Sequence, residues 1–499
     1  MIKNTYKPSF YSIYFLCLFQ FFCSSCESDL DKINENPNFS ETVSPQLLLT
    51  AVSAHAFKVS ELAPMYASRM VIGIGEENTF QYYKWSNGTM SNYNQLMQLQ
   101  KMTEEAEKIN NANYKALALF LKSVYFFDLT LRFGDIPFSD ALKAETHQMF
   151  HPKYDSQEQV FEGILSYLQE ANELINTSDV ILGDIIFQGD VLQWKKLINA
   201  FRLKVLITLS NKDRVGGFEV ASTFRTIFEL EELMLSDKDN GSLVFYDATS
   251  SRYSQFNNSS YGSSLYMSSF IVEQLQQCED PRLFVFAQPT ASALERNESL
   301  TAFSSYNGGN PISQYAANAL LVADKNISKV QSRYYLDPIN EPHSLLGFSE
   351  QQFILSEAVL RGWIPGDAVT YYESGIVNSF KFYQDNPLVS SALFDGFNPS
   401  EYLEHNKVKL SVSDSFENNL EKIILQKYLT LFHQGSWTSY FEYLRTSFPN
   451  WPIDAASPAL KRWRYPLSEY NNNISNLQEA LNRQFGGSDS VIEATWWLK

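Results

Sequence analysis

Cysteine is scarce in this sequence of 499 residues, and its four copies are unevenly placed. Cys17, Cys23 and Cys26 all lie within the first 26 residues, which leaves Cys278 alone in the rest of the chain. A single thiol cannot form an intrachain disulfide, although an exported protein could keep one. Stability must therefore come from a hydrophobic core, and a chain of this length can bury a large one.

Positive charge is also in short supply. The chain has 39 Lys and Arg against 56 Asp and Glu, a formal net charge of −17. Lys3 and Lys7 fall in the first 25 residues, which contain no acid, so the remainder has 37 basic and 56 acidic residues and a net charge of −19. Phosphates are repelled by a field of that sign, so the charge argues against nucleic acid as a partner and against a second, electrostatic membrane contact. We expect no nucleic acid partner.

Histidine is too rare to favour a catalytic or metal site, because only six are present. His147 and His151 have the spacing of a helical metal pair, but Pro152 follows at once and no Glu lies between them. Residues 237–241 resemble the start of a calcium loop, yet Ala248 stands where a bidentate Glu is needed. No nucleophile elbow and no phosphate-binding glycine loop occurs. The sequence predicts no enzyme activity, no cofactor and no metal ion; ion binding at 237–241 is the less favoured alternative.

Long apolar runs are confined to residues 10–22, which follow the basic start of the chain. This run is shorter than the roughly 20 residues that a membrane-spanning helix needs, and it has the form of a secretory signal. Two serines then precede Cys26, whose thiol is placed for lipidation after signal cleavage. Cys23 stands where a leucine is usual, and a plain secretory signal with a chance cysteine is the alternative.

These features predict three segments. Residues 1–25 form a lipoprotein signal peptide, and residues 26–45 form a lipid-anchored tether, since they are polar and rich in Asn, Pro and Ser. Residues 46–499 form one helical domain with loop insertions. We expect the protein to be exported and held to a membrane by a lipid on Cys26.

Apolar residues recur at helical spacing in several blocks. One block ends at Gly134 and Pro137, which stop a helix. Ser156 opens a Ser-Gln-Glu-Gln capping box, and Asp190 is placed to cap a further helix. The predicted helices cover residues 114–133, 156–174, 190–209, 351–362, 367–380 and 418–434. Paired helices of this kind predict a helical-repeat scaffold, although no clean 34-residue repeat is present.

Three long irregular stretches separate these blocks, at residues 73–93, 246–269 and 288–347. Loops of such length are usually functional or disordered. Residues 81–88 combine large rings with amides, and flat rings stack on sugars or hold peptide side chains at low entropic cost. The alternative is that the rings form a satellite core beneath the loops. The candidate ligand-binding residues are Tyr82, Tyr83, Trp85, Asn87, Tyr253, Tyr261 and Tyr306.

Several segments together resemble the SusD/RagB family of outer-membrane nutrient-binding lipoproteins, in particular its second large subgroup. The stretch after Cys26 and Arg-Phe-Gly-Asp-Ile-Pro-Phe at 132–138 are typical of it. Leu444 departs from the pattern, since a second arginine is frequent near that position, and residues 285–345 do not align. The other matching segments are residues 152–157, 189–190, 194–195, 199–203, 280–283, 356–358, 361–363, 366–368, 371–372, 426–429, 434–435, 464–466, 469, 472 and 496–497.

The resemblance implies a mostly α fold: a tetratricopeptide-like helix-pair scaffold with long irregular loops and few short strands. It implies a non-catalytic lipoprotein of the Bacteroidota outer membrane, exposed at the cell surface and acylated on Cys26. Its partner would be a SusC-like TonB-dependent barrel transporter, and its ligand an oligosaccharide. A peptide ligand in the same architecture is the first alternative, and an extracellular hydrolase with a helical domain is the second. The family's ligand residues differ between members and are not carried over.

Overall fold

The computed structural model describes residues 43–411 and 413–499. The predicted signal peptide, Cys26 and almost all of the predicted tether lie outside the described residues. The chain divides into two compact units, Met1–Ser44 and Pro45–Lys499. The helices and strands of the described residues belong to the second unit.

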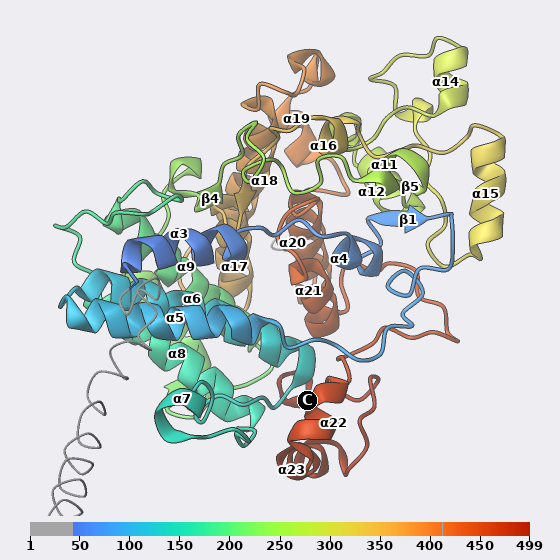
Figure 1. Cartoon of the computed structure of the whole chain (residues 1–499). Coiled ribbons are helices and arrows are strands. Elements are labelled where there is room, and N and C mark those ends of the chain that lie inside the picture. The colour runs from blue at the N-terminus through green and yellow to red at the C-terminus, as the bar shows by residue number, and fades with distance from the viewer. Residues whose placement is uncertain (1–42, 412) are drawn as a thin grey trace, which may run out of the picture. The chain divides into compact units, whose positions relative to one another are not determined.

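One part of this unit is a layered set of helices, in which sequence neighbours such as α5 and α6 or α17 and α18 pack side by side (Figure 1). This arrangement confirms the predicted mostly α, helix-pair scaffold. Its helices are α3 (Pro45–Ala56), α5 (Asn92–Lys108), α6 (Ala112–Phe133), α8 (Gln157–Leu174), α9 (Val191–Thr208), α10 (Val220–Leu230), α17 (Phe348–Leu360), α18 (Ala368–Gln384) and α20 (Phe416–Thr430).

The helix boundaries follow the capping signals of the sequence. Ser156 and Gln159 form the predicted capping box of α8, and the Asp190 carboxylate accepts hydrogen bonds from the first turn of α9. Three predicted helix ends are wrong by three or four residues: α17 begins at Phe348 and not at residue 351, α18 continues to Gln384 beyond residue 380, and α20 ends at Thr430 and not at residue 434. His433 and Gly435 both have positive φ, which no helix can contain, so the chain leaves the helical path before the predicted glycine stop.

The helical layers enclose a core of aliphatic and aromatic side chains. Trp194 of α9 is fully buried, and its ring makes edge contacts with Phe57, Phe120 and Phe187 from three other segments. Aromatic pairs at such angles add to the stabilisation that burial itself provides. Among the described residues, no helix combines the length and the apolar character that a membrane crossing requires.

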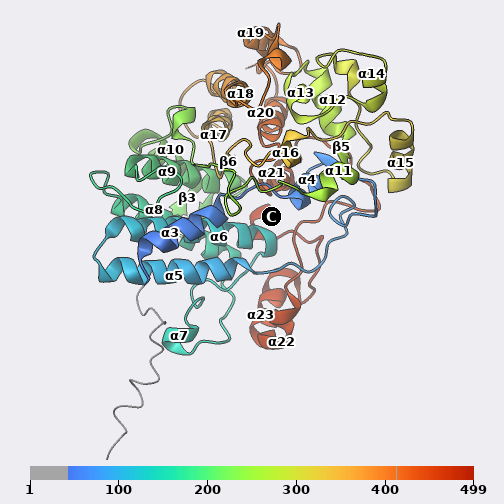
Figure 2. The ribbon, with the colours of Figure 1, turned by 45° about the horizontal axis from the view of Figure 1, so that its top comes forward.

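The rest of the unit consists of long loops, short helices and short strands. Among them, β5 (Leu265–Met267) lies to the right of the helical layers in Figures 1 and 2. Strands pair only in twos among the described residues: β1 (Val71–Gly73) with β5 (Leu265–Met267), β2 (Arg214–Val215) with β3 (Phe218–Glu219), and β4 (Ser242–Leu243) with β6 (His343–Ser344). All three pairs are antiparallel.

The short helices complete the description. They are α4 (Leu62–Ala67), α7 (Ala144–His147), α11 (Ser259–Ser263), α12 (Ser269–Gln277), α13 (Arg282–Phe286), α14 (Ala291–Glu295), α15 (Tyr315–Ala323), α16 (Arg333–Leu336), α19 (Pro399–Glu404), α21 (Thr438–Thr446), α22 (Leu467–Asn472) and α23 (Ile474–Phe485), with 3-10 turns at η1 (Asp237–Asp239), η2 (Phe303–Ser305), η3 (Ser391–Phe394) and η4 (Trp496–Leu498).

Candidate ligand-binding site

Two irregular segments that are far apart in the sequence meet beside β1 and β5. They are residues 74–91, which link β1 to α5, and residues 307–314, which lead into α15. Together with α15 they form a surface that we call the loop face. It lies at the right edge of the molecule in Figure 1, and α15 keeps that place in Figure 2.

Side chains of the first segment tie the two halves of the loop face together. The Oε1 atom of buried Gln81 accepts a hydrogen bond from the Gly73 amide at 2.8 Å, and its Nε2 donates to the Pro311 carbonyl at 3.3 Å. The Tyr82 hydroxyl donates to the Ser313 carbonyl at 2.8 Å. These bonds hold residues 74–91 and 307–314 in one arrangement.

Glycines let the second segment approach the sheet. The Gly309 amide donates to the Met267 carbonyl at 3.0 Å, and the Gly309 carbonyl accepts from the Ser269 amide at 2.8 Å. A Cβ atom at Gly308 would overlap the backbone of Ser268 and Ser269. The glycine pair is therefore what allows residues 307–314 to lie directly against the end of β5.

The helix α15 closes the outer edge of the loop face. Two of its apolar side chains, Leu321 and Val322, pack on a small cluster of Ile72, Tyr266 and Ile327. Two other apolar side chains of α15 reach solvent: Tyr315 is 44 % exposed and Leu320 is 67 % exposed. The helix is thus anchored by Leu321 and Val322 and leaves Tyr315 and Leu320 accessible.

Two of the predicted ligand-binding residues have side chains that reach solvent on or beside this face. Tyr82 is partly buried, and burial followed by the charge of Glu77 raises the pKa of its hydroxyl. Asn87 is exposed, and its Nδ2 donates to the Tyr465 carbonyl at 2.7 Å. In each residue a hydrogen bond fixes one polar atom of the side chain, and the rest of the side chain stays accessible to solvent.

Tyr83 and Trp85 lie beneath the loop instead. Trp85 is 6 % exposed and its ring contacts an aromatic cluster that also holds Trp437 and Trp463. Tyr83 donates its hydroxyl to the Ala67 carbonyl at 2.8 Å and is also buried. The two rings support residues 74–91 from below, which is the satellite-core alternative that the sequence left open.

The three remaining predicted residues are buried in other places. Tyr253 makes edge contacts with His343, and Tyr261 stacks on His433 at a ring separation of 5.7 Å. Tyr306 donates its hydroxyl to the Leu300 carbonyl at 2.6 Å. All three are less than 5 % exposed, so burial favours a core role for them, and a ligand contact by these rings stays a prediction.

Sequence reasoning missed Tyr315, which is the more exposed ring of the loop face. It falls in residues 285–345, the stretch without a family alignment, and no aromatic neighbour marks it. Near it, Asn310 and Gln314 are exposed, and Thr79 is exposed on the facing segment. Rings beside amides and a hydroxyl suit a ligand that is rich in hydroxyl groups and has flat apolar faces.

The two candidate metal sites of the sequence are the turn at 237–241 and the pair of His147 and His151. In the turn at 237–241, the Asp239 carboxylate accepts a hydrogen bond from Lys196 at 3.0 Å, and the Asp237 carboxylate pairs with Lys381 at 2.7 Å. His147 and His151 are exposed. Within the described part of the chain, no group of three or more His, Cys, Asp or Glu is placed to hold a metal ion.

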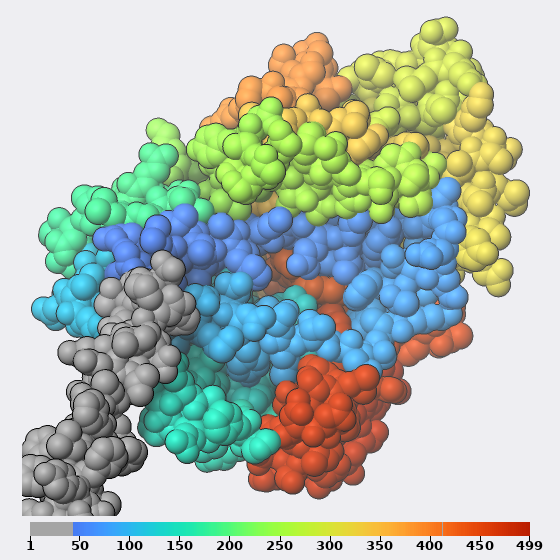
Figure 3. Space-filling model, in the orientation of Figure 1, coloured from blue at the N-terminus to red at the C-terminus, as the bar shows by residue number. Residues whose placement is uncertain are grey.

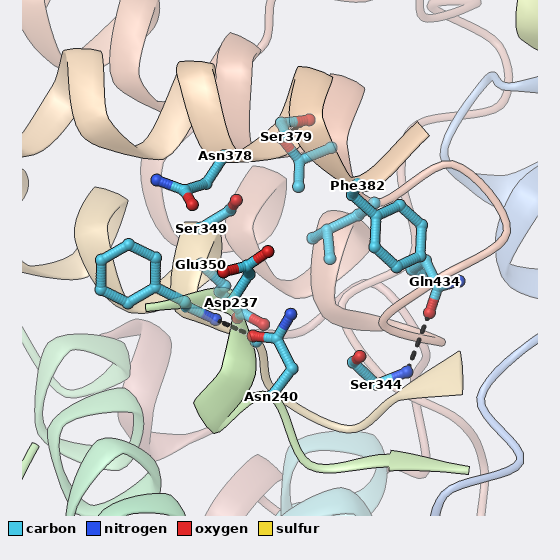
Figure 4. Close-up of a pocket in the computed structure, with 13 residues that line it drawn as sticks. Asp237, Asn240, Ser344, Ser349, Glu350, Asn378, Ser379, Phe382 and Gln434 are labelled. Atoms are coloured by element: carbon cyan, nitrogen blue, oxygen red, sulfur yellow. Dashed lines mark hydrogen bonds between the residues drawn. The ribbon is translucent and has the colours of Figure 1, made fainter. Parts of the chain in front are cut away.

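A small pocket lies away from the loop face, beside α17, α18 and α20 (Figure 4). The Asn240 Oδ1 accepts from the Phe348 amide there at 2.6 Å, and the Gln434 Oε1 accepts from the Ser344 amide at 3.0 Å. The volume of this pocket is about 50 Å³. Ligand pockets usually measure roughly 300–1,000 Å³, so this one is too small for an oligosaccharide.

Residues 38–466 match a family model, SusD-like, described as starch-binding and associating with the outer membrane. A comparison with curated proteins gives no match. The family match therefore rests on the model and on solved structures.

Solved structures share both the fold and a substantial part of the sequence. A SusD homolog from Bacteroides fragilis is 44 % identical, with a TM-score of 0.87. A Bacteroides vulgatus outer-membrane protein connected with nutrient binding is 43 % identical, with a TM-score of 0.88. A further Bacteroides fragilis SusD homolog is 31 % identical, with a TM-score of 0.86. Each comparison covers 92 % of this chain and 100 % of the other.

Proposed function

Because this chain belongs to the SusD-like family of starch-binding proteins that associate with the outer membrane, we propose that it binds nutrient oligosaccharides at the loop face. It delivers them, without catalysis, to a SusC-like TonB-dependent barrel transporter. In this proposal the protein is anchored by a lipid on Cys26 and faces the cell exterior. Residues 1–25 are removed as a signal, residues 26–45 act as a tether, and residues 46–499 form the binding domain.

The observation that carries the glycan proposal is that the rings of Tyr82 and Tyr315 both reach solvent on the loop face, whose two segments are held together by hydrogen bonds. The Tyr82 hydroxyl is fixed to the Ser313 carbonyl, two residues before Tyr315. A ring that is already fixed loses little entropy when it stacks on a sugar. Exposed Asn310 and Gln314 supply amide donors and acceptors for the hydroxyls of the same ligand.

Affinity electrophoresis tests this proposal. Gels cast with starch, xylan or mannan should retard the detergent-solubilised full-length protein in at least one case. Tyr82→Ala and Tyr315→Ala should each weaken retention by on the order of 1–3 kcal/mol, as for a lost aromatic stacking contact. Tyr246→Ala is the matched control, because that ring is 60 % exposed outside the loop face. Equal loss in the control would contradict a site at the loop face.

A peptide ligand is the second candidate, and the exposed side of α15 favours it. Leu320 and Tyr315 together offer an apolar surface for peptide side chains. Pull-down with a peptide library, run beside the gels, separates the two ligand classes. A discrete bound peptide and retention by no glycan would overturn the glycan proposal. Products from labelled oligosaccharides or casein, lost on changing one acidic residue, would instead support a hydrolase.

A further inference from the structure

A second cleft opens on the helical part of the molecule. It lies between the segment that joins α3 to α4, the start of α5 and the outer side of α6, and its volume is about 390 Å³. Figure 3 shows the surface hollowed between the blue segment leading into α4 and the lighter blue start of α5. The volume falls within the range of small-molecule sites.

The inner wall of the cleft is fixed by hydrogen bonds. The Tyr125 hydroxyl lies 2.9 Å from His55 Nδ1. The Asp128 carboxylate accepts from Asn92 Nδ2 at 2.8 Å and from Arg132 Nε at 2.9 Å. These side chains bond one another, so the wall is already organised before any ligand enters.

Glu61 at the mouth of the cleft is different, because its carboxylate forms no hydrogen bond or ion pair with the described residues. It holds the N-cap position of α4 but makes no capping hydrogen bond. No Lys, Arg or His nitrogen of the described residues lies within 4.0 Å of it. The side chains of Glu61 and Lys58 both reach solvent at the cleft. Partial burial raises the pKa of Glu61, against the opposing charge of Arg132.

Positive charge stands across from Glu61 without reaching it. Lys58 forms no ion pair with any carboxylate of the described residues, although its charge acts on both Glu61 and His55. Arg132 uses Nε and one terminal nitrogen on Asp128, so its other terminal nitrogen keeps its N–H donors. The Glu61 carboxylate, the Lys58 ammonium and the remaining N–H donors of Arg132 thus line one cavity.

We propose that this cleft is a second binding site, for a small zwitterionic ligand of the amino acid or short peptide class. The ligand ammonium pairs with Glu61, and its carboxylate pairs with Lys58 and the free N–H groups of Arg132. A neutral sugar would gain no ion pair from Glu61 or Lys58, whereas a zwitterion pairs with both. A divalent cation fits less well, because Asp128 is already occupied by Arg132.

The proposed site is independent of the proposed glycan site. Its lining comes from α3, α5, α6, the segment before α4, Leu345 and Ser436, whereas the loop face comes from residues 74–91, 307–314 and α15. Failure of glycan binding would not affect the cleft. Glu61→Gln should therefore leave retention in glycan gels unchanged, while Tyr315→Ala should leave zwitterion binding unchanged.

Isothermal titration calorimetry with alanyl-alanine tests the proposal on the detergent-solubilised full-length protein. We expect saturable binding, with at least tenfold weaker affinity for both N-acetyl-alanyl-alanine and alanyl-alanine amide. These ligand changes need no variant, so folding cannot confuse the result. Muramic acid, a zwitterionic sugar, is a further test ligand. If it binds more tightly than the dipeptide, the cleft recognises the same pair of charges on a sugar.

Two variants assign the ends of the ligand. Glu61→Gln should abolish the preference for the free over the acetylated dipeptide, and Lys58→Met should abolish the preference for the free acid over the amide. Glu417→Gln and Lys461→Met are the matched controls, since both side chains are exposed outside the cleft. No saturable heat with any zwitterion, or equal affinity for free and blocked dipeptides, would overturn the proposal.

Discussion

Trp85 belongs to an aromatic cluster beneath the loop face. Its ring centroid lies 5.4 Å from that of Trp463, 5.5 Å from that of Tyr440 and 5.6 Å from that of Phe80. Its Nε1–H has no hydrogen-bond partner among the described residues, so its contribution comes from packing. At the scale of one residue, a ring that looks like a ligand contact in the sequence can be the support of its loop.

We therefore expect Trp85→Ala to lower the free energy of unfolding by about 3–5 kcal/mol, as large-to-small changes of buried aromatics do. Thermal and urea denaturation measure the change. Trp85→Phe should cost less, because it keeps most of the packed volume. An unchanged melting temperature together with lost glycan retention would show that Trp85 acts directly on the ligand.

Two buried histidines should make stability depend on pH. Neither ring nitrogen of His343 has a partner among the described residues, and burial followed by the charge of Lys58 lowers its pKa to about 3. Burial, and then the charges of Arg333 and His343, lowers the pKa of His433 well below its usual value. Both rings are therefore neutral in the folded protein near pH 7.

The unfolded chain binds protons on these rings below its own pKa of about 6.5, whereas the folded chain does not. Stability is thus full above pH 6.5 and falls toward pH 3, by up to about 1.4 kcal/mol per pH unit for each histidine. Urea titrations between pH 7 and pH 5 measure this slope. His343→Phe should flatten it, whereas exposed His147→Gln should not; equal slopes in both variants would contradict the assignment.

At the scale of elements, a chain of buried charges, called here the charge chain, joins three helices of the scaffold to the short helix α21. Lys204 of α9 lies 3.0 Å from Glu350 of α17, which in turn lies 3.4 Å from Lys427 of α20. All three side chains are less than 10 % exposed. No local sequence pattern marks the charge chain, because its residues come from separate helices.

The charge chain continues into α21. Lys427 donates to Glu442 at 2.7 Å, and Arg445 pairs with both Glu442 and Glu357 of α17. Burial alone would raise the pKa of Glu442, but the charges of Arg445 and Lys427 hold that pKa well below its usual value. The family often has a second arginine near Leu444, but no arginine is needed at that position to complete the charge chain.

Removing one member should leave charges buried without compensation. We expect Glu442→Gln to cost about 3–5 kcal/mol of folding stability, by analogy with broken buried ion pairs. The loss should change little between low and high salt, because buried pairs are poorly screened. Differential scanning calorimetry at two salt concentrations measures both effects, with Glu417→Gln on the exposed start of α20 as control. A cost below about 1 kcal/mol would contradict this role of the chain.

At the scale of the whole molecule, the sequence predicts the scaffold better than the site. Helices such as α8 and α9 carry their caps and apolar stripes in consecutive residues. The loop face instead depends on contacts between distant segments: Gln81 and Tyr82 donate to carbonyls 230 and 231 positions away. Backbone carbonyls give no side-chain signal, and residues 288–347 have no periodicity that would place them.

The proposed lipid anchor leads to a prediction about the whole chain. We expect Cys26→Ala to move the protein from the membrane fraction to the soluble fraction while its melting temperature stays the same. The reason is charge: the chain after residue 25 has a net charge of −19, so an anionic membrane surface repels it once the lipid is absent. Fractionation after a salt wash and immunoblotting measure the distribution. The control is Ser25→Ala, which keeps a small residue before the cysteine and should remain with the membrane. Retention of the Cys26→Ala variant after the wash would contradict a single anchor.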